Sequence, residues 1–169
     1  SEIEIYGEES DIEAAENKNH VNAAGVTAEA STTEASSLPV SNIKDGNNQT
    51  RWASDYSEAS KQTVTVTFPK VTLVKELDFD LHTRDVAPMP SNVKSFDLVY
   101  ADAAGTEHTV KISNAKSTES GKTGYVTNVQ HIFETPVYMK SFKMTNFDLQ
   151  IDIEGQNGYN NISILEVRA

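Results

Sequence analysis

The 169-residue sequence contains no cysteine, so no disulfide bond can stabilise its fold. Two settings are compatible with this lack: a reducing cytosol, or export by a bacterium that stabilises the protein with a metal ion in place of disulfides. No apolar run approaches the roughly 18 residues that a membrane-spanning helix needs, and no signal peptide precedes Ser1. Because the chain starts abruptly, we expect it to be a fragment of a longer protein, in which an export signal would not be visible.

Basic residues are also scarce. The sequence has 14 Lys and Arg against 25 Asp and Glu, which gives a net charge of −11 at pH 7. Such a surface repels phosphate backbones and anionic lipids, so we expect neither nucleic acid nor a membrane surface as a partner. The histidines show no close metal-ligand spacing, and no nucleophile-elbow pattern is present. We therefore expect no catalytic apparatus.

The residues that are present favour β-structure. Val, Thr and Ser are frequent, and 169 residues suffice for one domain with a sizeable core. Alternating or short apolar segments predict strands, which we place at residues 63–68, 73–81, 95–100, 108–112, 125–133, 139–147 and 161–167. Pro69 is expected to end the first of them. Strands at this spacing, without an amphipathic helix between them, predict an all-β fold built as an antiparallel β-sandwich.

The N-terminal residues allow two interpretations. Residues 1–7 alternate like a strand and resemble the terminal segment 163–168. We expect residues 1–20 to be a linker or the end of a preceding similar module, with the domain itself spanning residues 21–169. In the alternative interpretation, residues 1–7 form an extra edge strand of this domain and residues 11–18 a short helix.

One loop is rich in oxygen ligands. The segment Asp45-Gly-Asn-Asn-Gln-Thr50-Arg-Trp52 offers a carboxylate, amides and a hydroxyl within six residues. Asp-Gly-Asn alone is an ordinary turn signal. Glu166 adds one carboxylate to an otherwise apolar terminal strand. Ca²⁺ takes six to eight oxygen ligands, many of them carbonyls, so the two segments would form a calcium site if the chain ends meet in space.

Together with the hairpin of residues 95–112 and the strand of residues 137–144, this segment resembles a factor V/VIII type C (discoidin) domain. Within that group the chain is most similar to the family 32 carbohydrate-binding modules of secreted bacterial glycoside hydrolases. The resemblance covers residues 21–169 and rests mainly on the Asp45–Trp52 segment and the final strand. It implies a jelly-roll sandwich of the galactose-binding-domain-like type, a structural Ca²⁺ and the binding of sugars.

The resemblance also implies roles for individual residues. Side-chain oxygens of Asp45, Thr50 and Glu166 would bind Ca²⁺, joined by backbone carbonyls of Asn42, Asn47, Thr50 and Leu165. Trp52 would pack inward beneath this loop. For the sugar, Arg84 is the leading candidate, because a guanidinium can bind two adjacent hydroxyls at once. The other expected sugar-binding residues are His82, Asp85, Asn92, Asp55, Tyr56, Asn157 and Tyr159, with Tyr56 and Tyr159 as aromatic platforms.

One departure from the family pattern bears on specificity. Galactose-binding members commonly carry His directly after the motif Trp, where this chain has Ala53. We therefore expect terminal N-acetylglucosamine-type sugars first and galactose second. The expected function is that of a non-catalytic, monomeric module of a secreted or cell-surface bacterial glycosidase, bound to host-type glycans. The alternatives are a protein- or surface-binding adhesion module of the same fold and, third, a β-sandwich enzyme.

Overall fold

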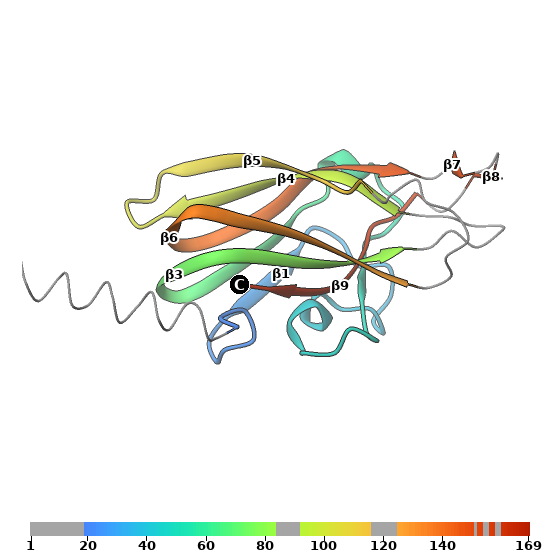
Figure 1. The fold of residues 1–169 in the computed structure, drawn as a ribbon. Helices are drawn as coiled ribbons and strands as arrows, with labels where there is room; N and C mark the ends of the chain where they lie inside the picture. Colours follow the sequence, from blue (N-terminus) through green and yellow to red (C-terminus); the bar gives the residue numbers. More distant parts are fainter. Residues whose placement is uncertain (1–18, 84–91, 116–124, 151, 154–155, 158–159) are drawn as a thin grey trace, which may run out of the picture.

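The structure is a computed structural model, and it describes residues 19–83, 92–115, 125–150, 152–153, 156–157 and 160–169. Strands dominate these residues (Figure 1). The strands are β1 (Thr27–Ala30), β2 (Trp52–Ala53), β3 (Val64–Thr83), β4 (Asn92–Asp102), β5 (Glu107–Ser113), β6 (Tyr125–Gln150), β7 (Asp152–Ile153), β8 (Gln156–Asn157) and β9 (Ser163–Arg168). Two 3-10 turns, η1 (Val40–Lys44) and η2 (Ala59–Lys61), complete the list. The predicted all-β class is confirmed, and no helix in the described ranges is long and apolar enough to cross a membrane.

All the pairings between described strands are antiparallel. The main sheet has the order β2-β9-β3-β6-β4-β5, with β1 also paired to β3, while β7 and β8 form a separate pair. Figure 1 shows β3 and β6 doubling back together at the left, so that the sheet forms two layers. The predicted antiparallel sandwich is therefore present, and its two layers share two long bent strands.

These bent strands correct the sequence-based boundaries. Residues 63–68 and 73–81 were expected to be separate strands, as were 125–133 and 139–147, but each pair forms one strand, β3 or β6. Pro69 lies inside β3, where the register with β6 shifts between Thr67 and Thr72. Proline has no N–H to donate, and at such an irregularity no ladder hydrogen bond is lost. The proline thus marks the bend between layers and does not end the strand.

The core lies between the layers. Its largest fully buried side chains include Trp52, Phe79, Phe96 and Phe142. Phe96 contacts Phe79 edge-to-face at 5.0 Å and Phe147 at 5.5 Å between ring centroids. These rings come from β3, β4 and β6, so aromatic packing fixes the distance between the layers that carry the site.

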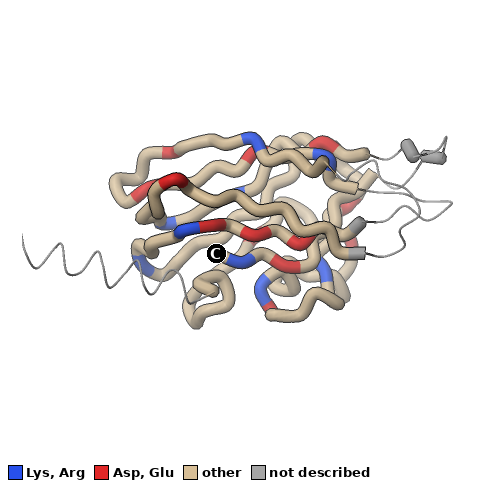
Figure 2. Tube along the Cα trace, in the orientation of Figure 1, with Lys and Arg blue, Asp and Glu red and all other residues tan. Residues whose placement is uncertain are grey.

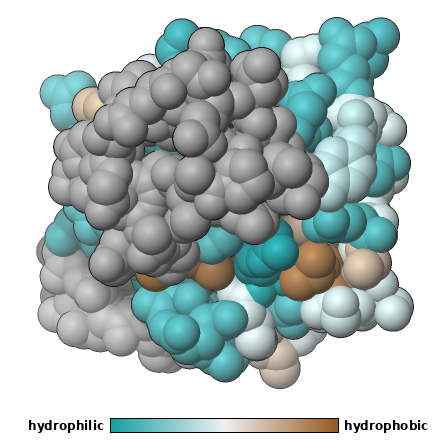
Figure 3. Space-filling model, turned by 90° about the vertical axis from the view of Figure 1, so that its right-hand side faces the viewer, coloured by the Kyte–Doolittle hydropathy of each residue, from teal (hydrophilic) through white to brown (hydrophobic). Residues whose placement is uncertain are grey.

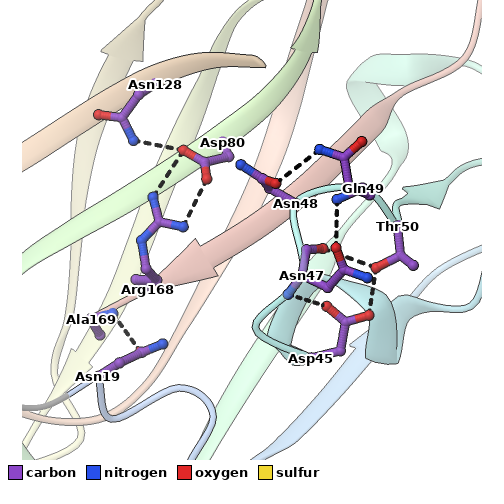
Figure 4. Close-up of polar contacts among 10 residues, drawn as sticks. All are labelled: Asn19, Asp45, Asn47, Asn48, Gln49, Thr50, Asp80, Asn128, Arg168 and Ala169. Atoms are coloured by element: carbon purple, nitrogen blue, oxygen red, sulfur yellow. Dashed lines mark hydrogen bonds and ion pairs between the residues drawn. The ribbon is translucent and has the colours of Figure 1, made fainter. Parts of the chain in front are cut away.

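The first described residues pack against the C-terminus. The His20 amide donates to the Ala169 carbonyl (3.0 Å), and the Ala169 amide donates to Asn19 Oδ1 (3.3 Å; Figure 4). The two predicted interpretations of the N-terminal segment concern residues 1–18, which lie outside the described residues.

Candidate functional site

The Asp45 loop forms a compact set of oxygens after η1. Asp45 Oδ1 accepts from the Asn47 amide and Asn47 Oδ1 from the Gln49 amide, both at 2.9 Å (Figure 4). Gly46 between them has φ +75°, a left-handed conformation that glycine adopts without strain. The Thr50 hydroxyl contacts both Asp45 Oδ2 and the Asn47 carbonyl. A hydroxyl has one proton and can donate to only one of them. One of these two oxygens therefore receives no proton from Thr50.

Glu166 lies in β9 beside this loop. Its Cα pairs with Asp80, whereas Ile164 pairs with Leu81, so Leu165 is an extra residue in β9. Such a bulge disrupts the ladder locally and leaves the extra residue unpaired. It also allows Leu165 and Glu166 both to be buried, with 5% and 2% of their surface exposed. The predicted calcium ligands of the last strand therefore lie where β9 departs from regular pairing.

The Glu166 carboxylate is buried with only partial compensation. Neither of its oxygens has a hydrogen-bond partner among the described residues. Burial, and then the nearby negative charge of Asp45, raise the pKa of Glu166 to about 7. The Arg168 charge and the Gly46 amide oppose this shift only in part, and the amide approaches without forming a hydrogen bond of ordinary geometry. A cation between Asp45 and Glu166 would neutralise both charges, so these residues fit Ca²⁺.

The donors gathered by this loop are oxygen atoms, which would suit Ca²⁺ better than a transition metal. Across the described ranges, no three His, Cys, Asp or Glu residues are grouped so as to hold a metal ion. A calcium shell needs few carboxylates, because backbone carbonyls fill the remaining positions. Asn42, the other predicted ligand, donates its side-chain amide to the Arg51 carbonyl (2.8 Å) and so closes the loop at its base.

The loop and the last strand are also joined directly. Arg51 Nη1 donates to Ser163 Oγ at 2.7 Å, and Trp52 pairs with Ile164. Trp52 is fully buried and donates its indole N–H to the Thr32 carbonyl at 3.0 Å. The prediction that Trp52 packs in the core is confirmed. These contacts hold the loop and the last strand together without the help of a cation.

A second polar cluster lies on the other side of β9 (Figure 4). Arg168 donates to both oxygens of Asp80 at 2.7 and 2.9 Å, and Asn128 donates to Asp80 at 2.8 Å. Burial raises the pKa of Asp80, but these hydrogen bonds and the Arg168 charge outweigh burial and lower it overall. Figure 2 shows acidic residues recurring along β3, where Glu76, Asp78 and Asp80 alternate. Sequence analysis missed this pair, since the two residues meet only through the β3–β9 pairing.

The end of the sandwich at which β3 terminates lies at the right of Figure 1. Leu81 and Trp52 both pair with Ile164, so the segments after them, with His82 and with Asp55 and Tyr56, emerge together. Figure 3 views this end and shows a mainly hydrophilic described surface with small hydrophobic areas. Arg84, Asp85 and Tyr159 lie outside the described residues, and Asn157 is described only by its place in β8.

Two of the remaining candidates differ in exposure. Tyr56 is 51% exposed, as an aromatic platform must be, whereas Asn92 is only 1% exposed at the start of β4. Asn92 was expected to bind sugar, but its burial keeps its side chain from the described surface. Asn92 pairs with Gln150 in the β4–β6 ladder and is therefore part of the sheet. His82 is half-buried near the end of β3.

The structure adds two residues that sequence reasoning missed, Glu34 and Asn161. The Tyr56 hydroxyl donates to Glu34 Oε1 at 2.9 Å, and Asn161 Nδ2 contacts Glu34 Oε2 at 3.2 Å. Glu34 is exposed, while Asn161 is 6% exposed and also contacts the Ser54 carbonyl. No spacing in the sequence relates these residues. Glu34 could be noticed only as one acidic residue in a polar loop.

Asp55, which precedes Tyr56, is held by other partners. The Ser57 amide donates to Asp55 Oδ1 at 2.9 Å, and Gln62 Nε2 donates to it at 3.2 Å. These hydrogen bonds, first among them the one from the Ser57 backbone, lower the pKa of Asp55, so it is ionised at neutral pH. The Asp55 amide donates to Thr32 Oγ1, and the Glu34 amide donates to the Ala53 carbonyl. Two loops thus carry an aromatic ring and two carboxylates at one end of the sandwich.

The chain belongs to the F5/8 type C domain family, whose model matches residues 27–167. No curated protein matches the chain. Solved structures do. A family 32 carbohydrate-binding module of Clostridium perfringens NanJ, solved with galactose, is 18% identical with a TM-score of 0.61, covering 89% of this chain and 96% of that one. At this sequence identity, the similarity shows that the two proteins share a fold.

Two further solved structures show the same architecture. A module of a Clostridium perfringens family 89 enzyme, in complex with GalNAc-β-1,3-galactose, is 15% identical with a TM-score of 0.57, covering 89% of this chain and 98% of that one. A chitosan-binding module from a Paenibacillus chitosanase/glucanase is 20% identical with a TM-score of 0.58, covering 89% and 98%. The resemblance stated from sequence to discoidin-like domains and family 32 modules is therefore confirmed.

Proposed function

We propose that this domain is a non-catalytic carbohydrate-binding module that attaches a secreted bacterial glycosidase to glycans by binding their terminal sugars. The observation that carries this proposal is the exposed Tyr56 ring, fixed by Glu34 beside Asp55 at the end of the sandwich where the predicted binding loop begins. An aromatic face binds the C–H side of a sugar, and carboxylates accept hydrogen bonds from its hydroxyls. Solved structures of the same fold with galactose and GalNAc-β-1,3-galactose support this use of the fold.

The specificity we propose is N-acetylglucosamine-type sugars first and galactose second. Ala53 lacks the imidazole that the family's galactose-binding members present after the motif Trp, which weakens contacts to an axial hydroxyl. The complex of a similar module with galactose keeps galactose as the second candidate. A shallow site of this kind is expected to bind single sugars with millimolar to high-micromolar affinity, about −4 to −6 kcal/mol. Tethering would then raise the local concentration of the parent enzyme at its substrate.

Calcium is proposed as a structural ligand. Asp45, Thr50 and Glu166 would bind it through side chains, and Asn42, Asn47, Thr50 and Leu165 through carbonyls. The support is the buried Glu166 carboxylate, which has no hydrogen-bond partner among the described residues and lies close to Asp45. The ion would supply positive charge between the first loop and the last strand, and would not contact the sugar.

Calorimetric or NMR titration with N-acetylglucosamine, galactose and their β-linked disaccharides tests the proposed function. We expect saturable binding, reduced at least tenfold in Tyr56→Ala. Ile132→Ala is the matched control, because Ile132 is 60% exposed but pairs with Glu76 near the bend of β3, away from the binding end. Absence of binding to every sugar tested would refute the proposal.

A further inference from the structure

The buried side chain of Gln62 connects two loops of the sandwich. Gln62 lies between η2 and β3 and is 3% exposed. Its Oε1 accepts hydrogen bonds from the hydroxyls of Ser31 at 2.6 Å and Thr32 at 2.7 Å. Its Nε2 donates to Asp55 Oδ1 at 3.2 Å. One amide group therefore joins the loop that follows β1 to the loop that follows β2.

The two hydroxyls extend this connection to the backbone. The Thr63 amide donates to Ser31 Oγ at 2.9 Å, and the Asp55 amide donates to Thr32 Oγ1 at 3.1 Å. A hydroxyl has one proton, and when that proton goes to Gln62 Oε1 the oxygen is still able to accept from these amides. An ionised carboxylate can only accept, so the Gln62 amide directs its nitrogen to Asp55 and its oxygen to the two hydroxyls.

Asp55 is held at its amide, its carbonyl and its carboxylate, and Tyr56 follows it directly in the chain. In addition to the contacts with Thr32 and Gln62, the Asp55 carbonyl accepts from Ser54 Oγ at 2.9 Å. The strand β2 ends at Ala53, so side-chain hydrogen bonds hold this loop in place of a strand ladder. They fix the backbone from which the Tyr56 ring, 51% exposed, reaches the surface.

We propose that Gln62 is a positioning residue for sugar binding, which orders the Tyr56 loop through its contact with Asp55. The inference rests on the proposed function and adds a residue that would not contact the sugar itself. A loop that is ordered before binding loses less conformational entropy when the ligand binds. Because Gln62 precedes β3, replacing its side chain leaves the strand pairings of Val64 and later residues intact. Its replacement should therefore weaken sugar binding in a protein that is still folded.

A double-mutant cycle between Gln62 and Asp55 tests the inference. The affinity to be measured is that for the tightest-binding of N-acetylglucosamine, galactose and their β-linked disaccharides, well below the melting temperature. Gln62→Glu retains an acceptor for the two hydroxyls but places a second carboxylate beside Asp55. We expect it to lower the affinity about fivefold.

The same substitution should have little effect in the Asp55→Asn background. The repulsion is then absent, and the introduced amide can donate to the introduced carboxylate, so we expect a change of less than about twofold. A direct contact between Asp55 and the sugar does not disturb this comparison, because it is missing from both proteins of the second pair.

Gln130→Glu is the matched control. Gln130 pairs with Asp78, and its side chain lies beside the Asp78 carboxylate, so this substitution also places a carboxylate next to an aspartate. Gln130 lies on the side of β3 that faces away from β9 and β2. We expect a loss of stability, with the sugar affinity within about twofold of that of the unmodified protein.

The outcomes separate this inference from the proposed function. An equal loss of affinity from Gln62→Glu in both backgrounds, or a loss of stability with unchanged affinity, would overturn the inference and leave the proposed function standing. Failure of the unmodified protein to bind any of the sugars would defeat both.

A second pair of variants serves if Gln62→Glu does not fold. Thr32→Val removes the hydroxyl that joins Gln62 to the Asp55 amide, at nearly constant shape. It should lower the affinity about threefold, and Thr32→Ser, which retains the hydroxyl, should keep the affinity within about twofold. Unchanged affinity in Thr32→Val would overturn the inference.

Discussion

The carboxylates of Asp45 and Glu166 lie close enough that the charge of Asp45 helps to raise the pKa of Glu166. One belongs to the loop after η1 and the other to the last strand, β9. Glu166 is buried whereas Asp45 is exposed, and a buried carboxylate next to a second negative charge is unfavourable unless a cation or a proton neutralises it. This relationship is the reason for proposing Ca²⁺. It implies that the ion would stabilise the folded domain.

Removing calcium should destabilise the domain. A ligand that binds only the folded state at about 100 times its dissociation constant contributes about 2.7 kcal/mol. For a domain of this size we therefore expect a chelator to lower the melting temperature by about 5 °C or more. Differential scanning calorimetry with and without chelator measures the change, and added Ca²⁺ should restore the original value. An unchanged melting curve, with no bound ion by elemental analysis, would contradict the calcium site.

Glu166→Gln should have opposite effects with and without calcium. With Ca²⁺ present, the variant loses a ligand and is expected to be less stable than the unmodified protein by about 2 kcal/mol. In chelator the variant should be equally stable or more stable by up to about 2 kcal/mol, because a neutral amide replaces a buried, unpaired carboxylate. Urea unfolding in both buffers gives the two free energies. A similar loss of stability in both would mean that Glu166 stabilises the fold without a cation.

Trp52→Phe should affect stability and spare sugar binding. The ring is fully buried and its indole N–H donates to Thr32, so the variant loses packing and one hydrogen bond. We expect a loss of about 2–3 kcal/mol in the free energy of unfolding. The sugar affinity of the folded variant should stay within twofold. Tyr56→Ala provides the contrast, with little loss of stability and a large loss of affinity. A large drop in affinity for Trp52→Phe would identify Trp52 as a platform after all.

Asp97 should contribute stability that depends on pH. The hydrogen bond from Lys111 at 2.8 Å, opposed by burial and helped by Asn146, lowers the pKa of Asp97. A carboxyl whose pKa is depressed in the folded state contributes its stability above the unfolded value of about 3.9, and this contribution is lost as pH falls through the folded value.

Asp97→Asn therefore tests this contribution directly. At pH 7 we expect a loss of about 0.5–1 kcal/mol, a modest figure because Lys111 is half exposed. At pH 2.5 the variant and the unmodified protein should have nearly equal stability. Urea unfolding at the two pH values gives the comparison. A difference that persists at low pH would show that the ion pair is not its source.

The sequence by itself determined the all-β class, the family and the burial of Trp52. Alternating apolar residues bury one face of a strand wherever that strand lies, and the Asp45–Trp52 segment has a distinctive pattern. The sequence could not show that residues 63–68 and 73–81 form one strand. A proline inside a bend and a proline at a strand end look alike in sequence.

Only the tertiary structure decided which polar residues meet. The pairing of β2 and β3 with β9 brings Asp45 to Glu166 and Asp80 to Arg168. The contact of Tyr56 with Glu34 likewise depends on two loops that follow different strands. No local periodicity encodes such contacts, since they follow from strand order and register. The same packing buries Asn92, which its sequence neighbours had suggested as a sugar ligand.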